Sequence, residues 1–170
     1  MQIRAITRRD VQGLMRLKLA LARETDTMML EADERSDTVH STRHEIRDLK
    51  KSGSLLLGAF DEGTLIGYLC AERGIYRKIR HSAYITIGIL PVYQQQGIGT
   101  NFFRELDVWA EENNITRLEL TVMAHNERGI ALYRKAGFET EGIKRNGLKQ
   151  NGKYIDEYSM AKVTEQSFRR

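Results

Sequence analysis

The sequence predicts a single α+β domain in which a central sheet lies between two helical layers, an α/β three-layer arrangement. Strand and helix periodicities follow one another in the order β–α–α–β–β–β–α–β–α–β–β, which gives about seven strands and about four helices. A chain of 170 residues with 41% hydrophobic residues is long enough to bury its own core. It has one proline and neither a repeat nor a linker, so we expect residues 1–163 to form the domain and 164–170 a tail.

The first third of the chain predicts a strand and two helices. Residues 2–6 alternate as a strand does, and residues 7–10 resemble a capping box that starts a helix over 11–23. Residues 24–37 lack periodicity and are expected to form a loop or a broken helix. A polar surface helix is expected over 38–51.

The middle of the chain predicts three strands. Residues 55–60 and 65–72 flank the turn Asp61-Glu-Gly-Thr and are expected to form a hairpin. Residues 83–90 are apolar on both faces, which is typical of a central strand. Cys70 lies in an apolar strand, so we expect a buried thiol rather than a nucleophile.

A glycine turn at 94–100 joins this central strand to an amphipathic helix over 98–112. Such a turn leaves backbone N–H groups unpaired at the start of a helix, where the helix dipole adds partial positive charge. Turns of this kind bind anions, phosphates above all, and Gly97 and Gly99 would let a phosphate approach the backbone.

The last third predicts a strand, a helix and a closing hairpin. Residues 118–122 alternate, and Asn126 can cap a helix that stops at Gly137. Strands are expected over 138–145 and 154–161, with Asn151-Gly152 as a turn between them.

Charge, hydropathy and cysteine content limit the partners and the location expected for the protein. The net charge of +4 is mild, but residues 24–37 hold six acidic residues against Arg35 alone, and residues 73–81 are basic. We expect no membrane partner, because no apolar run has the length of a membrane span. A single cysteine and an N-terminus without the apolar core of a signal peptide point to a cytoplasmic protein.

The element order and two motifs resemble the GNAT acyltransferases. The pattern Gln94-x-x-Gly97-x-Gly99 matches the phosphate turn of that family, and Asn126 with Leu132-Tyr133 and Gly137-Phe138 matches its Asn…Leu-Tyr-x-x-x-Gly-Phe helix. The stretch from Asn151 to Met160 is similar to bacterial members that acetylate small amines or protein N-termini. The resemblance implies a mixed, mostly antiparallel sheet that splays between its fourth and fifth strands.

The resemblance also implies acetyl-CoA as cosubstrate, with no metal. The diphosphate would rest on the turn, and the pantetheine arm would pair with the fourth strand and with Asn126. The residues expected to bind it are Ile87, Gly88, Ile89, Gln94, Gln95, Gln96, Gly97, Ile98, Gly99, Thr100 and Asn126.

Transfer of an acetyl group to an amine needs an oxyanion donor, an acid for the departing thiolate and a base. The resemblance assigns the Ile89 N–H as donor and Tyr133 as acid. The glutamate that serves several N-terminal acetyltransferases as base is replaced here by Thr121. Glu119, two residues earlier, and a water relay are the alternatives for that role.

The acceptor is expected to be a small cationic amine or a protein N-terminus. In the family the acceptor lies beside the linker between the first two helices, which here is acidic, so Glu24, Glu31 and Asp33 are candidate contacts. Met28-Met29-Leu30 in the same linker is either a pocket wall or a hydrophobic anchor. The rival functions are a non-catalytic acyl-CoA sensor and a nucleic-acid binder, although we expect no nucleic-acid partner; a homodimer is also open.

Overall fold

The computed structural model describes residues 1–164 of the chain. The predicted tail falls almost wholly on residues 165–170, which lie outside the described residues. The strands are β1 (Gln2–Ala5), β2 (Leu55–Asp61), β3 (Thr64–Arg73), β4 (Ser82–Ile89), β5 (Arg117–Met123), β6 (Glu139–Gln150) and β7 (Lys153–Val163). The α-helices are α1 (Val11–Glu24), α2 (Val39–Ser52), α3 (Ile98–Glu112) and α4 (Glu127–Lys135). No helix within residues 1–164 is both long and apolar enough to cross a membrane.

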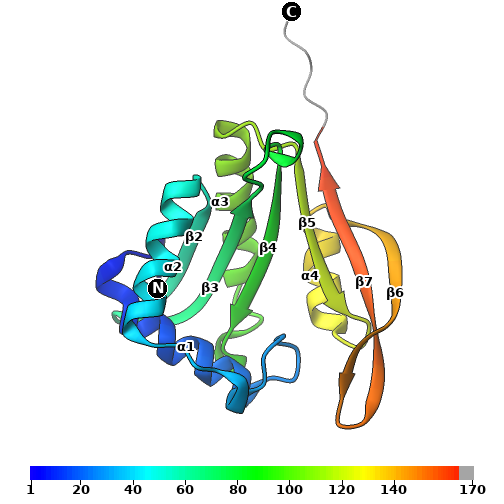
Figure 1. Cartoon of the computed structure of the whole chain (residues 1–170), viewed down its shortest axis with the longest axis horizontal. Coiled ribbons are helices and arrows are strands. Elements are labelled where there is room, and N and C mark those ends of the chain that lie inside the picture. The colour runs from blue at the N-terminus through cyan, green and yellow to red at the C-terminus, as the bar shows by residue number, and fades with distance from the viewer. Residues whose placement is uncertain (165–170) are drawn as a thin grey trace, which may run out of the picture.

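The strands form one seven-stranded sheet in the order β1-β2-β3-β4-β5-β7-β6. Neighbouring strands run antiparallel except for β4 and β5, which are parallel. This confirms the predicted mixed, mostly antiparallel sheet. Because β4 and β5 each feed the helix that follows, α3 and α4 begin at the same end of the sheet (Figure 1).

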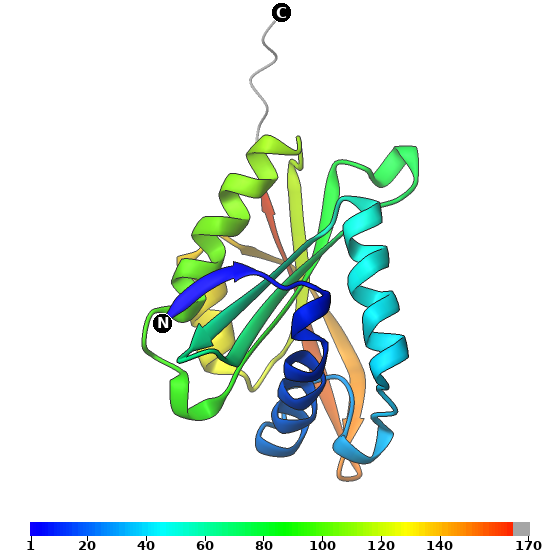
Figure 2. The ribbon, with the colours of Figure 1, turned by 90° about the vertical axis from the view of Figure 1, so that its left-hand side faces the viewer.

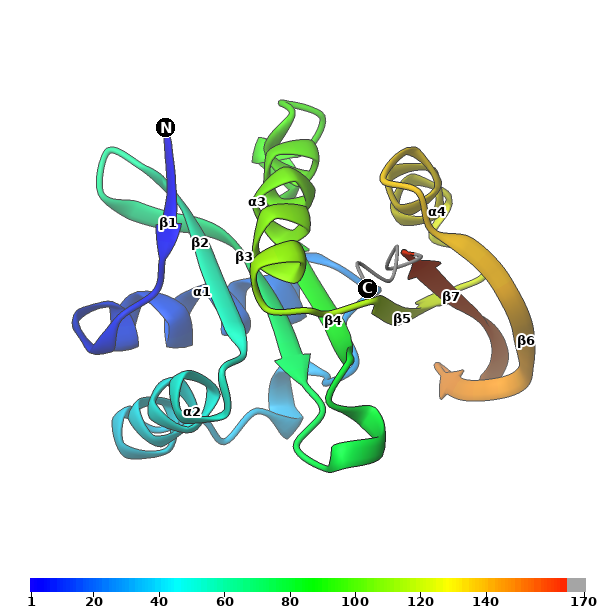
Figure 3. The ribbon, with the colours of Figure 1, turned by 90° about the horizontal axis from the view of Figure 1, so that it is seen from above.

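Helices cover both faces of the sheet, which confirms the predicted three layers. Helices α1 and α2 lie on one face and α3 and α4 on the other (Figure 2 and Figure 3). Each face has its own apolar core: Leu14 and Leu21 of α1 belong to one cluster, and Phe102 and Leu106 of α3 belong to the other. Cys70 is buried in the core on the α1 side, which confirms the expected burial, and burial raises the pKa of its thiol to about 12.

The sheet is split between β4 and β5. These strands pair only from Ser82↔Arg117 to Tyr84↔Glu119, whereas β3 and β4 stay paired as far as Ile89. Figure 1 shows the two halves of the sheet diverging below that short contact. Among the described residues, the edge of β4 beyond Tyr84 therefore has no strand partner on its β5 side, as the resemblance implied.

Local signals fix the helix ends. Thr38 caps α2 through the Ser41 N–H, and the Asn126 side chain accepts the Gly129 N–H at 2.9 Å to cap α4. Gly53 and Gly137 follow α2 and α4 with φ of 76° and 93°, the left-handed conformation that ends helices. The predicted loop over 24–37 contains one short 3-10 turn, Ala32–Glu34.

Strand β6 differs most from its prediction. It continues to Gln150, although the sequence predicted an end at residue 145. Its register with β7 shifts between Lys144 and Leu148, where Asn146 has φ of 53°. The Asn146 N–H donates to the Asp156 carboxylate at 2.8 Å, so a bulge interrupts the strand pattern without ending the strand.

Candidate active site

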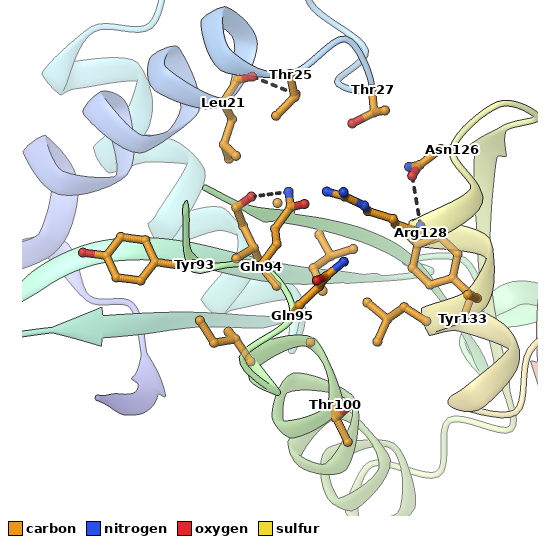
Figure 4. A pocket seen from close by; sticks show the side chains of 18 of the residues that line it. Leu21, Thr25, Thr27, Tyr93, Gln94, Gln95, Thr100, Asn126, Arg128 and Tyr133 are labelled. Carbon is orange, nitrogen blue, oxygen red and sulfur yellow. Dashed lines mark hydrogen bonds between the residues drawn. The ribbon is translucent and has the colours of Figure 1, made fainter. Parts of the chain in front are cut away.

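A cavity of about 540 Å³ lies where β4 and β5 separate. Its walls come from four segments: the C-terminus of α1 with the loop that follows, the end of β4, the turn after β4, and α4 (Figure 4). The cavity thus joins the split in the sheet to the start of α3.

The β4 wall carries unpaired backbone groups. The Leu90 N–H donates to the Ile66 carbonyl and the Gly74 N–H donates to the Ser82 carbonyl, so the even-numbered residues of β4 bond toward β3. In an antiparallel pair this alternation turns the odd-numbered residues the other way. Ile87 and Ile89 therefore direct their backbone groups into the split, where no strand of residues 1–164 meets them; of these groups, the Ile89 carbonyl is bonded by the Gln94 side chain.

The turn after β4 presents a row of peptide donors. Within residues 1–164, the N–H groups from Gln95 to Thr100 have no hydrogen-bond partner; the first bond of α3 is from the Asn101 N–H to the Gly97 carbonyl. Two side chains brace the turn, because Gln94 donates to the Ile89 carbonyl and Gln96 to the Val92 carbonyl, both at 3.0 Å. Donors grouped at a helix start form a site for an anion.

The glycines meet demands of backbone conformation and packing in addition to the predicted approach of a phosphate, which stays a prediction. Gly97 has φ of 81°, so the backbone itself requires glycine, and an added Cβ there would touch nothing within 4 Å. A Cβ at Gly99 would lie 2.7 Å from Leu132 of α4, and one at Gly88 would lie 2.5 Å from Leu21 of α1. Gly88 and Gly99 therefore permit close packing of helices, a requirement that a phosphate-turn motif does not reveal.

Tyr133 lines the cavity, and its ring packs against other aromatic side chains. Its ring is 8% exposed and stands edge-on to Phe103 of α3, with centroids 5.9 Å apart, and Phe138 flanks it. The hydroxyl has no hydrogen-bond partner in the described part of the chain. Burial, with a smaller contribution from the nearby Tyr84, raises the pKa of Tyr133 to about 12, so the phenol carries its proton at neutral pH.

The charged side chains of the described residues that line the cavity are both positive. Arg128 and Lys135 line it, and no carboxylate of the described residues does. Two cations and a row of peptide donors suit a ligand that carries several negative charges. A long, unpaired strand edge suits a ligand with an amide-bearing arm. The residues present therefore fit acetyl-CoA.

Most of the predicted cosubstrate residues line this cavity. They are Ile87, Gly88, Ile89, Gln94, Gln95, Gly97, Ile98, Gly99, Thr100 and Asn126, together with the predicted acid Tyr133. Gln96 does not line it, because its side chain folds back onto Val92.

Glu119 and the three acidic acceptor candidates are not brought to the cavity. Glu119 accepts a hydrogen bond from Arg117 at 2.6 Å, and Arg117 also binds Glu141. Glu24, Glu31 and Asp33 are exposed, and none of them lines the cavity.

Sequence reasoning missed two wall residues, Thr25 and Thr27, which line the cavity from the loop after α1. Met28 of the same loop lines the cavity and also packs against the α1-side core, so both readings of that residue hold. Asp26, between them, is tied to the other half of the sheet: its carbonyl accepts from Gln150 at 3.1 Å and its carboxylate lies 3.5 Å from His125. This loop therefore bridges the split.

Relatives of the chain are known. The model of the acetyltransferase (GNAT) family matches residues 20–138. The L-amino acid N-acetyltransferase AaaT of Escherichia coli is 31% identical over 117 residues, which span 66% of this chain and 70% of that protein. The N-alpha-acetyltransferase RimI of Mycobacterium tuberculosis is 35% identical over 115 residues, or 67% of this chain and 69% of that protein.

A solved structure has the same architecture. The acetyltransferase of the GNAT family from Streptococcus pneumoniae superposes with a TM-score of 0.91 at 28% identity, over 96% of this chain and 99% of that chain. The fold, the split sheet and the cavity between its halves agree with these matches. The chain belongs to the acetyltransferase (GNAT) family, and it is an acetyl-CoA-dependent N-acetyltransferase.

Proposed function

We propose that the 540 Å³ cavity holds acetyl-CoA and that the chain acetylates the α-amino group of an amino acid or of a peptide N-terminus. The observation that carries this proposal is the row of unpaired N–H groups from Gln95 to Thr100, at the rim of a cavity whose charged lining residues are cations. A nucleotide thioester matches such a lining, because its phosphates are anionic and its arm is extended.

Each wall has a proposed part in binding. The turn donates to the diphosphate, and the odd-numbered backbone groups of β4 pair with the amides of the pantetheine arm. Asn126 keeps its capping bond to Gly129 and retains its amide N–H₂ as a donor toward the arm. The thioester then lies on the side of the cavity where Tyr133 stands (Figure 4).

The chemistry follows from these positions. The amine nitrogen forms a bond to the thioester carbonyl carbon, and the Ile89 N–H donates to the resulting oxyanion. The C–S bond then breaks, and the departing thiolate takes the phenolic proton of Tyr133. A phenol held protonated by burial remains available as an acid throughout the neutral range.

Of the two routes open for the proton that the amine loses, we propose the water relay. Glu119 is paired with Arg117, and among the described residues no carboxylate lines the cavity. Water reaches the cavity between the two halves of the sheet and can carry the proton to solvent.

The loop after α1 is the proposed acceptor wall. Thr25 and Thr27 lie at the end of the cavity away from the phosphate turn (Figure 4), and Met28 lines the cavity from the same loop. Glu24, Glu31 and Asp33 lie on the exposed surface of the same segment. Their proposed role is long-range attraction of a cationic amine, which salt should weaken.

A thiol-release assay tests the proposal. Acetyl-CoA is mixed with the protein and with single members of a panel: free amino acids, short peptides with a free or blocked N-terminus, and polyamines. Turnover is expected with acceptors that carry a free α-amine and is expected to be lost when that amine is blocked. Binding of acetyl-CoA without thiol release for any acceptor would instead support the acyl-CoA sensor.

A further inference from the structure

Arg128 is a cation without a counterpart in the described part of the chain. It lines the cavity, and no ion pair or hydrogen bond joins its guanidinium to residues 1–164. Some partly buried cations of the described residues do have carboxylate partners: Arg117 binds Glu141, and Lys162 binds Asp107. An unpaired guanidinium beside a row of unpaired peptide donors suits the binding of an anion.

The packing of α4 against α3 sets where Arg128 lies. Leu132 of α4 touches α3 at Gly99, and Arg128 is four residues earlier, on the same face of α4 and about 6 Å along the axis. Helices α3 and α4 begin at the same end of the sheet. Moving one turn from Leu132 toward the N-terminus of α4 is therefore matched by moving one turn from Gly99 toward the N-terminus of α3. That step reaches Gln95 to Gly97, the unpaired donors of the turn.

The Arg128 side chain points toward the same end of the helices. Side chains on a helix lean toward its N-terminus, which carries Arg128 past the first turn of α4. In Figure 4 it extends from α4 over the cavity in the direction of Gln94, on the opposite wall from the helix that bears it.

We propose that Arg128 closes the diphosphate site from the side opposite the turn. The diphosphate of acetyl-CoA would lie between the N–H groups of residues 95–100 and the Arg128 guanidinium, so that α3 and α4 both hold it. This inference rests on the proposed function, since it presumes that the cavity binds acetyl-CoA. Arg128 is a binding residue here and takes no part in the transfer step.

The charge of the two substrates favours the cosubstrate over the acceptor as the partner of Arg128. An acceptor amine arrives as a cation and is repelled by a guanidinium, whereas a diphosphate offers oxygens to a planar, bidentate donor. Arg128 also extends toward Gln94, the first residue of the phosphate turn, in Figure 4.

The test uses the full chain with Arg128→Gln, Arg128→Lys and the matched control Arg134→Gln. Arg134 is an exposed arginine of the same helix that does not line the cavity. Calorimetry measures the Kd of CoA and of 3′-dephospho-CoA, and kinetics compare acetyl-CoA with acetyl-pantetheine, which lacks all the phosphates of the nucleotide.

Arg128→Gln is expected to raise the Kd of CoA and of 3′-dephospho-CoA by the same factor, about tenfold, or about 1.4 kcal/mol. The salt dependence of CoA binding should become shallower, Arg128→Lys should recover part of the affinity, and kcat/KM with acetyl-pantetheine should not change. Arg134→Gln should match the unsubstituted chain in every measurement.

Four results would overturn the assignment. Equal CoA affinity in Arg128→Gln would remove Arg128 from the site. A loss confined to CoA, absent with 3′-dephospho-CoA, would place it on the 3′-phosphate. A raised acceptor KM at unchanged CoA affinity would place it on the acceptor, and an equal loss with acetyl-pantetheine would make its role structural. If the unsubstituted chain bound no CoA, the proposed function itself would fail, which the first titration distinguishes.

Discussion

At the scale of single residues, Tyr133 has two roles: its ring packs in the core, and its hydroxyl is the proposed acid. Its ring completes an aromatic contact with Phe103 and Phe138 that joins α3, α4 and the start of β6. Tyr133 also lines the cavity, and its hydroxyl has a pKa of about 12, because burial disfavours the phenolate. The packing fixes the ring and leaves the proton available.

Tyr133→Phe separates these roles, because it keeps the ring and removes the proton. We expect kcat to fall by roughly 100-fold, the lower range for loss of a general acid, while the Kd of acetyl-CoA changes little. Tyr84→Phe is the control, since it also removes one hydroxyl, which bonds Thr121 at 2.8 Å and does not line the cavity. Turnover that Tyr133→Phe leaves unaltered would exclude the phenol as the acid.

At the scale of elements, the turn between β4 and α3 depends on the backbone of Gly97. Its φ of 81° points successive N–H groups outward before α3 begins. A residue with a Cβ is destabilised by about 1–2 kcal/mol in that conformation. Glycine is therefore favoured at this position.

Gly97→Ala can be compared with Gly63→Ala, a matched control. Gly63 lies between β2 and β3 with φ of 82°, and an added Cβ meets nothing within 4 Å at either site. Both variants should lose about 1 kcal/mol of unfolding free energy in urea titrations. Only Gly97→Ala should also weaken CoA binding in calorimetry; equal CoA affinities in the two variants would contradict a role for the turn.

The elements were largely predictable because their signals are local. Thr38, Asn126 and Gly137 mark helix ends through their own side chains or backbone angles, and each stands where the sequence placed it. The length of β6 was not predictable, because its bulge at Asn146 is held by Asp156 across the hairpin. A partner on another strand leaves no trace in the local pattern.

At the scale of the whole molecule, a charged contact near the N-terminus couples folding to pH. Asp10 accepts two hydrogen bonds from Arg4 of β1, at 2.8 and 2.9 Å, and one from the Thr7 N–H. These bonds lower the pKa of Asp10 from its usual 3.8 to about 2, the Arg4 bond contributing most. A carboxyl whose pKa is lower in the folded state stabilises the fold above pH 4 and loses that effect toward pH 2.

Asp10→Asn should therefore lower the free energy of unfolding by about 1–2 kcal/mol at pH 7. The difference from the unsubstituted chain should shrink as the pH falls from 4 toward 2, because Asp10 then becomes progressively protonated and loses its charge. Urea titrations at several pH values measure it. A difference that stays constant down to pH 2 would show that the ion pair is not its source.

The whole fold also decides which parts of the site a sequence can reveal. The phosphate turn and Tyr133 sit in motifs with fixed spacing, so they were found. Arg128, Thr25 and Thr27 reach the cavity only because α4 and the loop after α1 meet there. The acidic segment was conspicuous in the sequence, yet the fold leaves Glu24 exposed and outside the cavity.

The central claim is that the N–H groups at the start of α3 bind the diphosphate of acetyl-CoA and so position its thioester beside Tyr133. A crystal structure of the chain with CoA tests it most directly. We expect diphosphate oxygens within about 3.2 Å of N–H groups between residues 95 and 100, and the sulfur on the side of the Tyr133 hydroxyl. A diphosphate bound elsewhere, with those N–H groups facing only water, would contradict the account.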